Sequence, residues 1–417
     1  MSQFASYTKS PETARPVKVM RAVMDFVRWL NAYGEISYDH QSFFAGPLGR
    51  LAKQLYYRNK IMGTAAVAPM ILCEAFLPSA RRLFHKPLRF PIADAHYAMG
   101  FTFLYEVTGE TLYFQHTLHF LEQLKQSRCP QYEHYCWGYP FDWETCNGTI
   151  TRDTPLITTT PYVYEAFLQA YQQEARQEWR QILESIVQHV VTDIHDVDTS
   201  PHSSTCSYTP HGEWGVINAS AYRAFLLTSA SQALEDKRLW KIAELNIHFV
   251  LDNQNPDGSW YYAVDGVRNF VDHFHTCFVM KALAKIEQLT GHEGCRQALA
   301  RAVGYYVAYL FDEQGLPKPF SRAPRLTVYR HELYDYAECV NLCLLLRKDH
   351  TVLQGILDTV LDDLLTRWRK PDGSFRSREL RWGWDNVPMH RWAQSQLLRS
   401  LALYLQQQKA ATWEGLP

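Results

Sequence analysis

The chain has 417 residues, of which 47% are apolar and 20% charged, with a net charge of −1. This balance is typical of a folded globular protein. Its 42 basic and 43 acidic residues are spread evenly, so we expect no nucleic-acid partner, which would need a basic stripe. The most apolar uncharged run, residues 61–73, contains Pro69 and is too short to span a bilayer.

The first twenty residues contain no apolar core of a secretion signal. The nine cysteines form an odd set without CxxC spacing, which favours reduced thiols and a cytoplasmic location. Cys129, His134, Cys136 and Cys146 lie close in sequence, but their spacing matches no zinc module. We therefore expect neither a metal nor another cofactor.

Helical periodicity dominates the chain, after a first segment, 1–15, that we expect to be loosely ordered. Residues 16–78 predict additional helices that close or cap the fold. Amphipathic stripes then predict outer helices with one wet face, such as the stripe of Trp179, Ile182, Ile186 and Val190.

A second class of helix is apolar or small-sided on all faces, so each must be covered on every side. These helices are expected to start near residues 93, 160, 218, 272, 334 and 389. The regular spacing predicts a six-fold repeat of helical hairpins. The turns "NPDGSW" (255–260) and "KPDGSF" (370–375) lie two repeats apart, and their glycines are suited to ending an outer helix.

We therefore predict an all-α protein, an (α/α)6 toroid of the six-hairpin glycosidase-like type, formed by residues 1–417 as a single domain. In this fold the N-terminal ends of the inner helices meet at one mouth. Free N–H groups and positive helix-dipole ends suit that mouth to oxygen-rich or anionic ligands.

The segments expected at the mouth alternate aromatic residues with carboxylates and histidines. Flat rings can stack on a sugar, and acid and imidazole groups can hold its hydroxyls or move protons. The candidate catalytic residues are Asp142, Asp272, His275, Asp385 and His390. The candidate substrate-binding residues are Trp137, Tyr139, Trp143, Glu144, Asn218, Trp260, His273, Tyr334, Trp384 and Arg391.

Each candidate also has a structural explanation. Asp272 can serve as a helix cap, and His275, one turn later, can be a buried histidine that only pairs with it. His273 and Cys277 have the i, i+4 spacing of a metal pair, but two ligands do not make a site. The loop around Asp142 can be a packed aromatic turn, and Asp385 and His390 can cap or pair at the last inner helix.

Five blocks resemble a family of bacterial proteins of exopolysaccharide and cell-surface glycan biosynthesis, over about residues 35–405. The blocks are "CWGYPFDWET", "TPLITTTPYVYEAF", "VINASAYRAFLL", "QNPDGSWYYAVDG" and "VDHFHTCFVMKALAKIE". The resemblance implies a place in carbohydrate metabolism and a six-hairpin toroid, without a defined reaction. The wider superfamily includes unsaturated glucuronyl hydrolases, polysaccharide lyases and sugar epimerases, an analogy of fold alone.

A shorter stretch, Gln254, Gly258 and Trp260, resembles the Q-x3-G-x-W turn of squalene and related triterpene cyclases, which are also toroids. The DxDD acid motif of those enzymes is absent from the sequence. We interpret the shared turn as a way of ending an outer helix.

The sequence thus predicts a carbohydrate-active protein of surface polysaccharide biosynthesis. Glycoside hydrolase, lyase and epimerase chemistry all stay open. So do a non-catalytic glycan-binding or scaffold role and, as a third hypothesis, an isoprenoid cyclase-like role. The expected partner is an oligo- or polysaccharide, free or lipid-linked, and the oligomeric state is left open.

Overall fold

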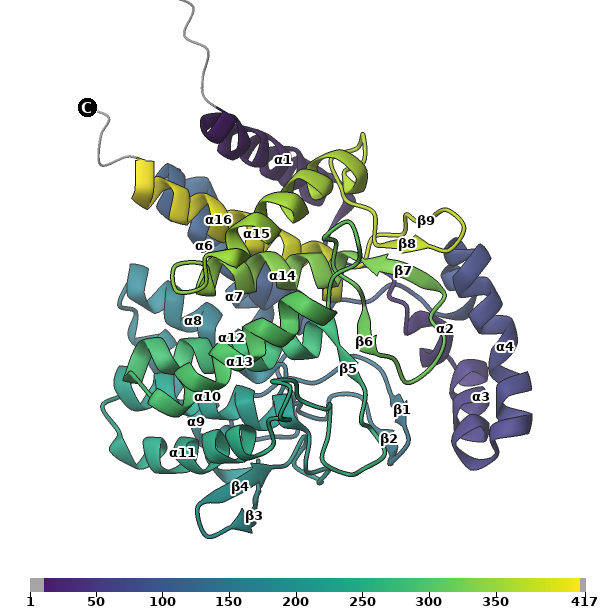
Figure 1. Ribbon diagram of the computed structural model, residues 1–417, viewed down its shortest axis with the longest axis horizontal. Helices are drawn as coiled ribbons and strands as arrows, with labels where there is room; N and C mark the ends of the chain where they lie inside the picture. Colours follow the sequence, from purple (N-terminus) through teal and green to yellow (C-terminus); the bar gives the residue numbers. More distant parts are fainter. Residues whose placement is uncertain (1–10, 413–417) are drawn as a thin grey trace, which may run out of the picture.

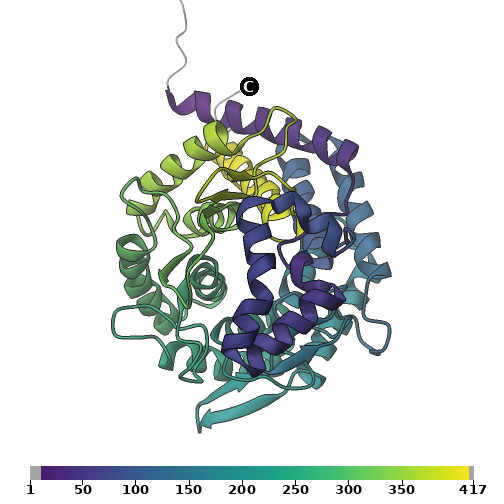
Figure 2. The same ribbon diagram turned by 90° about the vertical axis from the view of Figure 1, so that its right-hand side faces the viewer.

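The structure, a computed structural model, describes residues 11–412, with side chains described for residues 15–409. Six inner helices form a ring in which each contacts the next and the last contacts the first. They are α6 (Pro91–Thr108), α8 (Thr160–Gln173), α10 (Ile217–Ala233), α12 (His273–Thr290), α14 (Leu333–Leu346) and α16 (Ser395–Thr412), which the π-turn η3 (His390–Gln394) precedes. The ring is seen end-on in Figure 2.

The outer helices surround this ring. They are α1 (Pro11–Tyr33), α7 (Thr111–Gln126), α9 (Gln177–Thr192), α11 (Lys237–Asp252), α13 (Glu293–Tyr309) and α15 (Val352–Asp363), which the π-turn η2 (Leu364–Trp368) continues. The fold is an (α/α)6 toroid, as predicted. Of the segment expected to be loosely ordered, residues 11–15 begin α1 and residues 1–10 lie outside the described chain.

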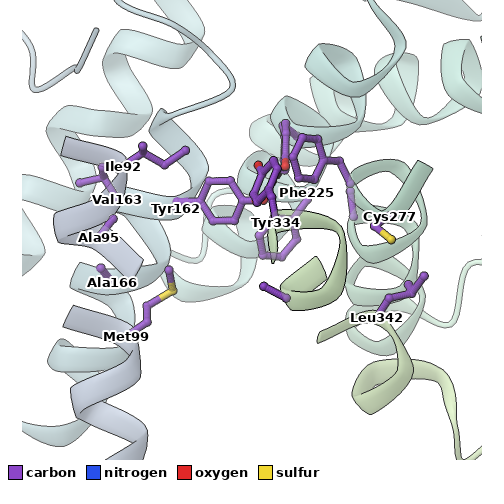
Figure 3. Packing of buried hydrophobic residues seen from close by; sticks show 14 of the residues in the cluster. Ile92, Ala95, Met99, Tyr162, Val163, Ala166, Phe225, Cys277, Tyr334 and Leu342 are labelled. Carbon is purple, nitrogen blue, oxygen red and sulfur yellow. Dashed lines mark hydrogen bonds between the residues drawn. The ribbon is translucent and has the colours of Figure 1, made fainter. Parts of the chain in front are cut away.

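Burial explains why the two classes of helix differ in sequence. In α9 the stripe of Trp179, Ile182, Ile186 and Val190 is buried, and the opposite face is exposed. In α10 every residue from Ile217 to Ala230 is buried, because outer helices, neighbouring inner helices and the ring centre cover all its sides. Figure 3 shows Tyr162, Phe225 and Tyr334 of three inner helices packed in the middle of the ring.

The loops at the N-terminal ends of the inner helices carry short antiparallel strands. Two-stranded sheets join β1 (Trp143–Thr145) to β2 (Gly148–Ile150), β3 (Asp196–Ser200) to β4 (Ser203–Cys206), and β5 (Val271–Asp272) to β6 (Phe320–Arg322). A three-stranded sheet has the order β7 (Tyr329–Glu332), β8 (Arg378–Leu380), β9 (Trp384–Asp385). In it, Arg378 lies opposite both Glu332 and Asp385.

The two Asp-Gly turns have the same construction. Asp257 Oδ1 accepts from the Ser259 N–H at 3.0 Å, and Asp372 Oδ1 accepts from the Ser374 N–H at 3.0 Å. Gly258 has φ +92°, and a Cβ there would lie 2.4 Å from the Arg301 carbonyl oxygen. This turn therefore requires glycine for both its backbone angle and its close approach to α13.

Between α1 and α6 the chain forms a separate layer, which we call the cap (residues 42–86). It contains α2 (Ser42–Ala45), α3 (Pro47–Arg58), α4 (Lys60–Phe76), the 3-10 turn η1 (Pro78–Ala80) and α5 (Arg81–Phe84). The cap lies on the mouth side of the ring, with α4 at the right-hand edge of the molecule in Figure 1. Across residues 11–412, the helices are all too short or too polar to cross a bilayer.

Candidate active site

Asp272 and His275 form the most clearly arranged acid/base pair at the mouth. Asp272 ends β5 and caps α12, with Oδ1 accepting from the His275 N–H at 2.9 Å. Its Oδ2 lies 2.6 Å from His275 Nδ1. A carboxylate in this position holds the proton on Nδ1 and leaves Nε2 as the acceptor. The His275 side chain is 24% exposed, and its Nε2 has no hydrogen-bond partner among the described residues.

Aromatic rings near this pair form two runs of ring contacts that together we call the collar. It consists of Tyr139, Trp143, Tyr208, Tyr262, Phe278, Tyr334 and Trp392. The His275 ring lies 4.7 Å from Tyr262 and 5.5 Å from Phe278, measured between ring centroids. The collar combines ring faces for stacking with hydroxyl groups for hydrogen bonding, the combination that a sugar requires.

A second group of polar residues, only partly anticipated from the sequence, joins the two ends of the collar. The predicted residue Arg391 is held by both oxygens of Asp39, at 2.9 and 2.8 Å. Its guanidinium carbon lies 3.6 Å from the centroid of the Trp392 ring and 4.7 Å from that of Tyr139. Arg391 Nη1 has no hydrogen-bond partner among the described residues. Arg391 is fully buried, its charge is balanced by Asp39, and it fixes the Trp392 and Tyr139 rings from beneath.

His40 and Lys53 also lie here, and the sequence analysis missed both. The His40 ring is 4.3 Å from Trp392. Burial, together with the positive charges of Arg378 and Arg391, holds the pKa of His40 well below its usual value, so its imidazole is neutral. Burial and the nearby Arg325 lower the pKa of Lys53 to about 8. No local motif marks either residue, since their neighbours come from distant parts of the chain.

The floor under the collar is polar and buried. The hydroxyl groups of Tyr162 and Tyr222 are 2.5 Å apart, and Lys281 forms an ion pair with Glu338. The predicted residue Tyr334 packs at the collar, 5.0 Å from Phe274. Asn218 is buried in the first turn of α10, and its Oδ1 has no hydrogen-bond partner among the described residues.

Three of the predicted carboxylates attach the cap to the ring. Arg50 of α3 contacts Asp142 at 2.5 Å and Glu144 at 2.8 Å. Burial opposes ionisation of Glu144, but hydrogen bonds from Thr149 and Arg50 lower its pKa below the usual value. Asp385 is fully buried and lies 2.6 Å from Arg81 of the cap. The carboxylate of Asp385 is enclosed between cap and ring, a position that suits a structural ion pair.

Other predicted residues are structural. His390 is fully buried, with Nδ1 2.6 Å from the Tyr97 hydroxyl and Nε2 3.0 Å from the Gly34 carbonyl oxygen. Burial lowers its pKa to about 4. His273 is likewise buried, 2.7 Å from the Tyr306 hydroxyl, and burial lowers its pKa to about 3. Both imidazoles are enclosed by the protein.

Three predicted tryptophans also lie away from the collar. The buried Trp137 and Trp260 donate their indole N–H groups to the carbonyl oxygens of Leu124 and Val250, each at 2.8 Å. Trp384 packs against Trp368 at 5.2 Å, at the end of the last outer helix. Their apolar surface stabilises the loops and does not stack on a ligand.

Within residues 11–412 no group of three or more His, Cys, Asp and Glu side chains is placed to hold a metal ion. Cys277, the partner suggested for His273, instead points its thiol at the Tyr306 hydroxyl, 3.5 Å away.

The sequence matches no protein-family model and none of the curated proteins. Solved structures nevertheless share the fold. Cellobiose 2-epimerase from Bacillus thermoamylovorans is similar with a TM-score of 0.62 and 10% identity, over 77% of this chain and 88% of that one. A D-mannose isomerase is similar with a TM-score of 0.58 and 14% identity, over 77% of this chain and 88% of that one. The family 76 α-mannanase from Bacteroides thetaiotaomicron is similar with a TM-score of 0.57 and 10% identity, over 77% of this chain and 87% of that one. At such identities the likeness establishes the toroid and not the reaction.

Proposed function

We propose that this protein is a carbohydrate-active enzyme that removes a proton from a sugar carbon, with His275 as the base. The observation that carries the proposal is the 2.6 Å contact of Asp272 with His275 Nδ1, which leaves Nε2 free at a partly exposed position. A positioned imidazole of this kind is the usual general base near neutral pH.

The reaction would begin at a C–H bond next to a carbonyl or carboxylate group of the sugar. His275 Nε2 takes the proton, and the electron pair of the C–H bond moves onto the adjacent oxygen as an enolate. The partly exposed Lys53 would favour that oxyanion with its positive charge. Delivery of a proton from solvent to the opposite face gives the epimer, whereas loss of a leaving group from the next carbon, protonated by the His275 imidazolium, gives an unsaturated sugar.

Most carboxylates near the mouth are already paired, which favours this chemistry over hydrolysis. Asp335 of α14 has no such partner among the described residues, and burial raises its pKa well above the usual value, but its side chain is fully enclosed. A glycosidase needs two carboxyl groups facing the substrate, one of them protonated. Here Asp39, Asp142, Glu144, Glu338 and Asp385 each form an ion pair with an arginine or lysine. Asp272 is engaged by His275. The comparison structures are described as epimerases, an isomerase, a lyase and glycoside hydrolases, so the choice rests on the site and not on them.

The cellular role that we propose is surface polysaccharide biosynthesis in the cytoplasm, with an oligosaccharide, polysaccharide or lipid-linked glycan as the substrate. It rests on the sequence resemblance given above. The collar also suits a glycan-binding protein without catalysis, which is the second candidate. The isoprenoid hypothesis has less support, because the mouth carries Arg391, Lys53, His40 and His275 beside its aromatic rings.

Exchange of sugar C–H protons with deuterated water tests the proposal, because it detects proton removal whatever the final product. The purified protein would be incubated in D2O with a panel of reducing and uronic-acid-containing oligosaccharides and followed by NMR. We expect exchange at one carbon of a preferred sugar, and a loss of about 100-fold or more in His275→Gln. Asp272→Asn should impair the rate by disturbing the imidazole tautomer.

The matched control is His202→Gln, at an exposed histidine of the β3–β4 hairpin, which should exchange at the normal rate. Full activity of a folded His275→Gln variant would refute the assignment. Release of reducing ends without exchange would indicate hydrolysis, and binding without either reaction would indicate the second candidate.

A further inference from the structure

The cap has a charge and a surface unlike the rest of the chain. Its residues 42–86 include seven basic residues and one acidic residue, although the whole chain has a net charge of −1. The basic residues are Arg50, Lys53, Arg58, Lys60, Arg81, Arg82 and Lys86, and the acidic one is Glu74. The expectation of evenly spread charge is therefore wrong locally.

The charges that hold the cap to the ring are distinct from those that face solvent. Arg50 and Arg81 are engaged by carboxylates of the ring, and Glu74 contacts Arg378 at 2.6 Å. The remaining cap charges are positive. Four of them are exposed, namely Arg58, Lys60, Arg82 and Lys86. The outer side of the cap is thus purely cationic.

Helix α4 presents an apolar stripe on this cationic surface. Its exposed residues at helical spacing are Ile61, Ala65, Pro69, Leu72 and Phe76. Ile61 is 86% exposed, Leu72 58% and Phe76 55%. A helix of a globular protein normally buries such a stripe. An exposed stripe of this kind marks a site that binds another protein or a membrane.

Apolar residues next to the stripe extend it. Trp382, in the β8–β9 turn, is 69% exposed and stacks on Phe76 with ring centroids 5.4 Å apart. Leu77 directly follows α4 and is also exposed, as is Leu83 of α5. Basic residues lie at both ends of α4 in sequence, with Arg58 and Lys60 before it and Arg82 and Lys86 after it. Figure 2 shows α3 and α4 across the face of the ring, on the side of the mouth loops.

We propose that the outer face of the cap docks on an anionic phospholipid bilayer. Apolar residues flanked by lysines and arginines are the composition of an interfacial helix, in which the apolar stripe enters the headgroup region and the cations meet anionic lipids. A second copy of this chain is the less favoured occupant, because two cationic faces would repel each other. Docking would hold the mouth at the membrane surface. This inference concerns attachment and does not depend on the reaction proposed above.

Vesicle co-sedimentation tests the proposal with the full chain. We expect binding to phosphatidylcholine vesicles that contain phosphatidylglycerol, and little binding to phosphatidylcholine alone. Raising the salt concentration from 0.05 to 0.5 M should weaken binding, since the charge attraction is screened (Debye length about 10 Å at 0.1 M). Brominated lipids should quench tryptophan emission, and Trp382→Phe should lose most of that quenching.

Two double variants separate the apolar and the charged contributions. The lipid concentration for half-binding should rise about 10-fold or more in each double variant, Ile61→Ser/Leu72→Ser and Arg58→Glu/Lys60→Glu. For the charged pair, the reason is that each cation near such a surface contributes about 1 kcal/mol, or about 5-fold. The control Leu112→Ser/Lys241→Glu changes an exposed leucine and an exposed lysine of the outer helices and should bind normally. All substituted residues are exposed, and melting curves would check folding.

Failure of the wild-type protein to bind anionic vesicles would overturn the proposal. So would equal binding by the apolar double variant, or a stable dimer that dissociates on Ile61→Ser while vesicles are ignored. Because sedimentation reads attachment alone, these outcomes are independent of whether any sugar exchanges its protons.

Discussion

Asp385→Asn tests how the cap is fixed to the ring. Asp385 and Arg81 are both fully buried and lie 2.6 Å apart. Arg378, the neighbour of Asp385 across the β8–β9 ladder, adds a second buried positive charge. The substitution keeps the shape of the side chain but leaves Arg81 without its counter-charge. We expect a loss of about 3–5 kcal/mol in the free energy of unfolding, the usual cost of breaking a buried pair.

The assay is urea unfolding followed by circular dichroism, together with limited proteolysis of the cap. Asp142→Asn is the matched control, because it breaks another Arg–Asp contact of the cap at a partly exposed position. That variant should cost about 1 kcal/mol or less. The double variant Arg81→Met/Asp385→Leu should recover most of the stability, because an apolar pair carries no buried charge.

Two results would refute this reasoning. One is an equal cost for Asp385→Asn and Asp142→Asn. The other is a double variant as unstable as the sum of its single changes. The double variant also separates the structural role of Asp385 from the catalytic one that the sequence suggested, since a stable protein with normal proton exchange has no need of this carboxylate in the reaction.

Four further predictions concern other parts of the molecule. His390 is neutral when folded, with its pKa lowered to about 4, so protons favour the unfolded state below the ordinary histidine value of about 6.5. Between about pH 6.5 and 4, the free energy of unfolding of the wild type should therefore fall with decreasing pH more steeply than that of His390→Gln, by about 1.4 kcal/mol per pH unit. Equal slopes for the two proteins in pH-dependent unfolding would contradict this. Gly258→Ala should lower the free energy of unfolding by more than about 1 kcal/mol, because the residue has φ +92° and its Cβ would meet a carbonyl oxygen; Gly304→Ala, at a helical glycine of α13 with open space, should be neutral or stabilising. His275→Gln should slow proton exchange about 100-fold or more in the NMR assay. Vesicle binding should follow the exposed apolar and basic residues of the cap.

The site could be predicted from the sequence only where its geometry is local. Asp272 and His275 are three residues apart at the start of a helix, so the cap and the side-chain contact follow from helix geometry. Asp39 and Arg391, by contrast, are separated by 352 positions, and no local pattern relates them. The same holds for His40 and Trp392, which meet only because the ring closes.

The roles of the carboxylates show the same division. An aspartate between aromatic residues is typical of a sugar site, and Asp142, Glu144 and Asp385 all fit that pattern in the sequence. Their partners, Arg50 and Arg81, belong to the cap, which is remote in the chain. Whether a carboxylate acts on a substrate or holds two layers together depends on which charge lies opposite, and that is a property of the folded molecule.

The helices, their two classes and their six-fold spacing follow from local sequence, because apolar periodicity, capping residues and Asp-Gly turns act within a few residues. The toroid and the end at which the mouth lies could therefore be predicted. Which polar residues face the mouth, which are sealed beneath the cap, and where the cationic surface gathers became visible only in the folded molecule. Those features depend on burial and on charges brought together from distant segments, and both arise only when the ring closes.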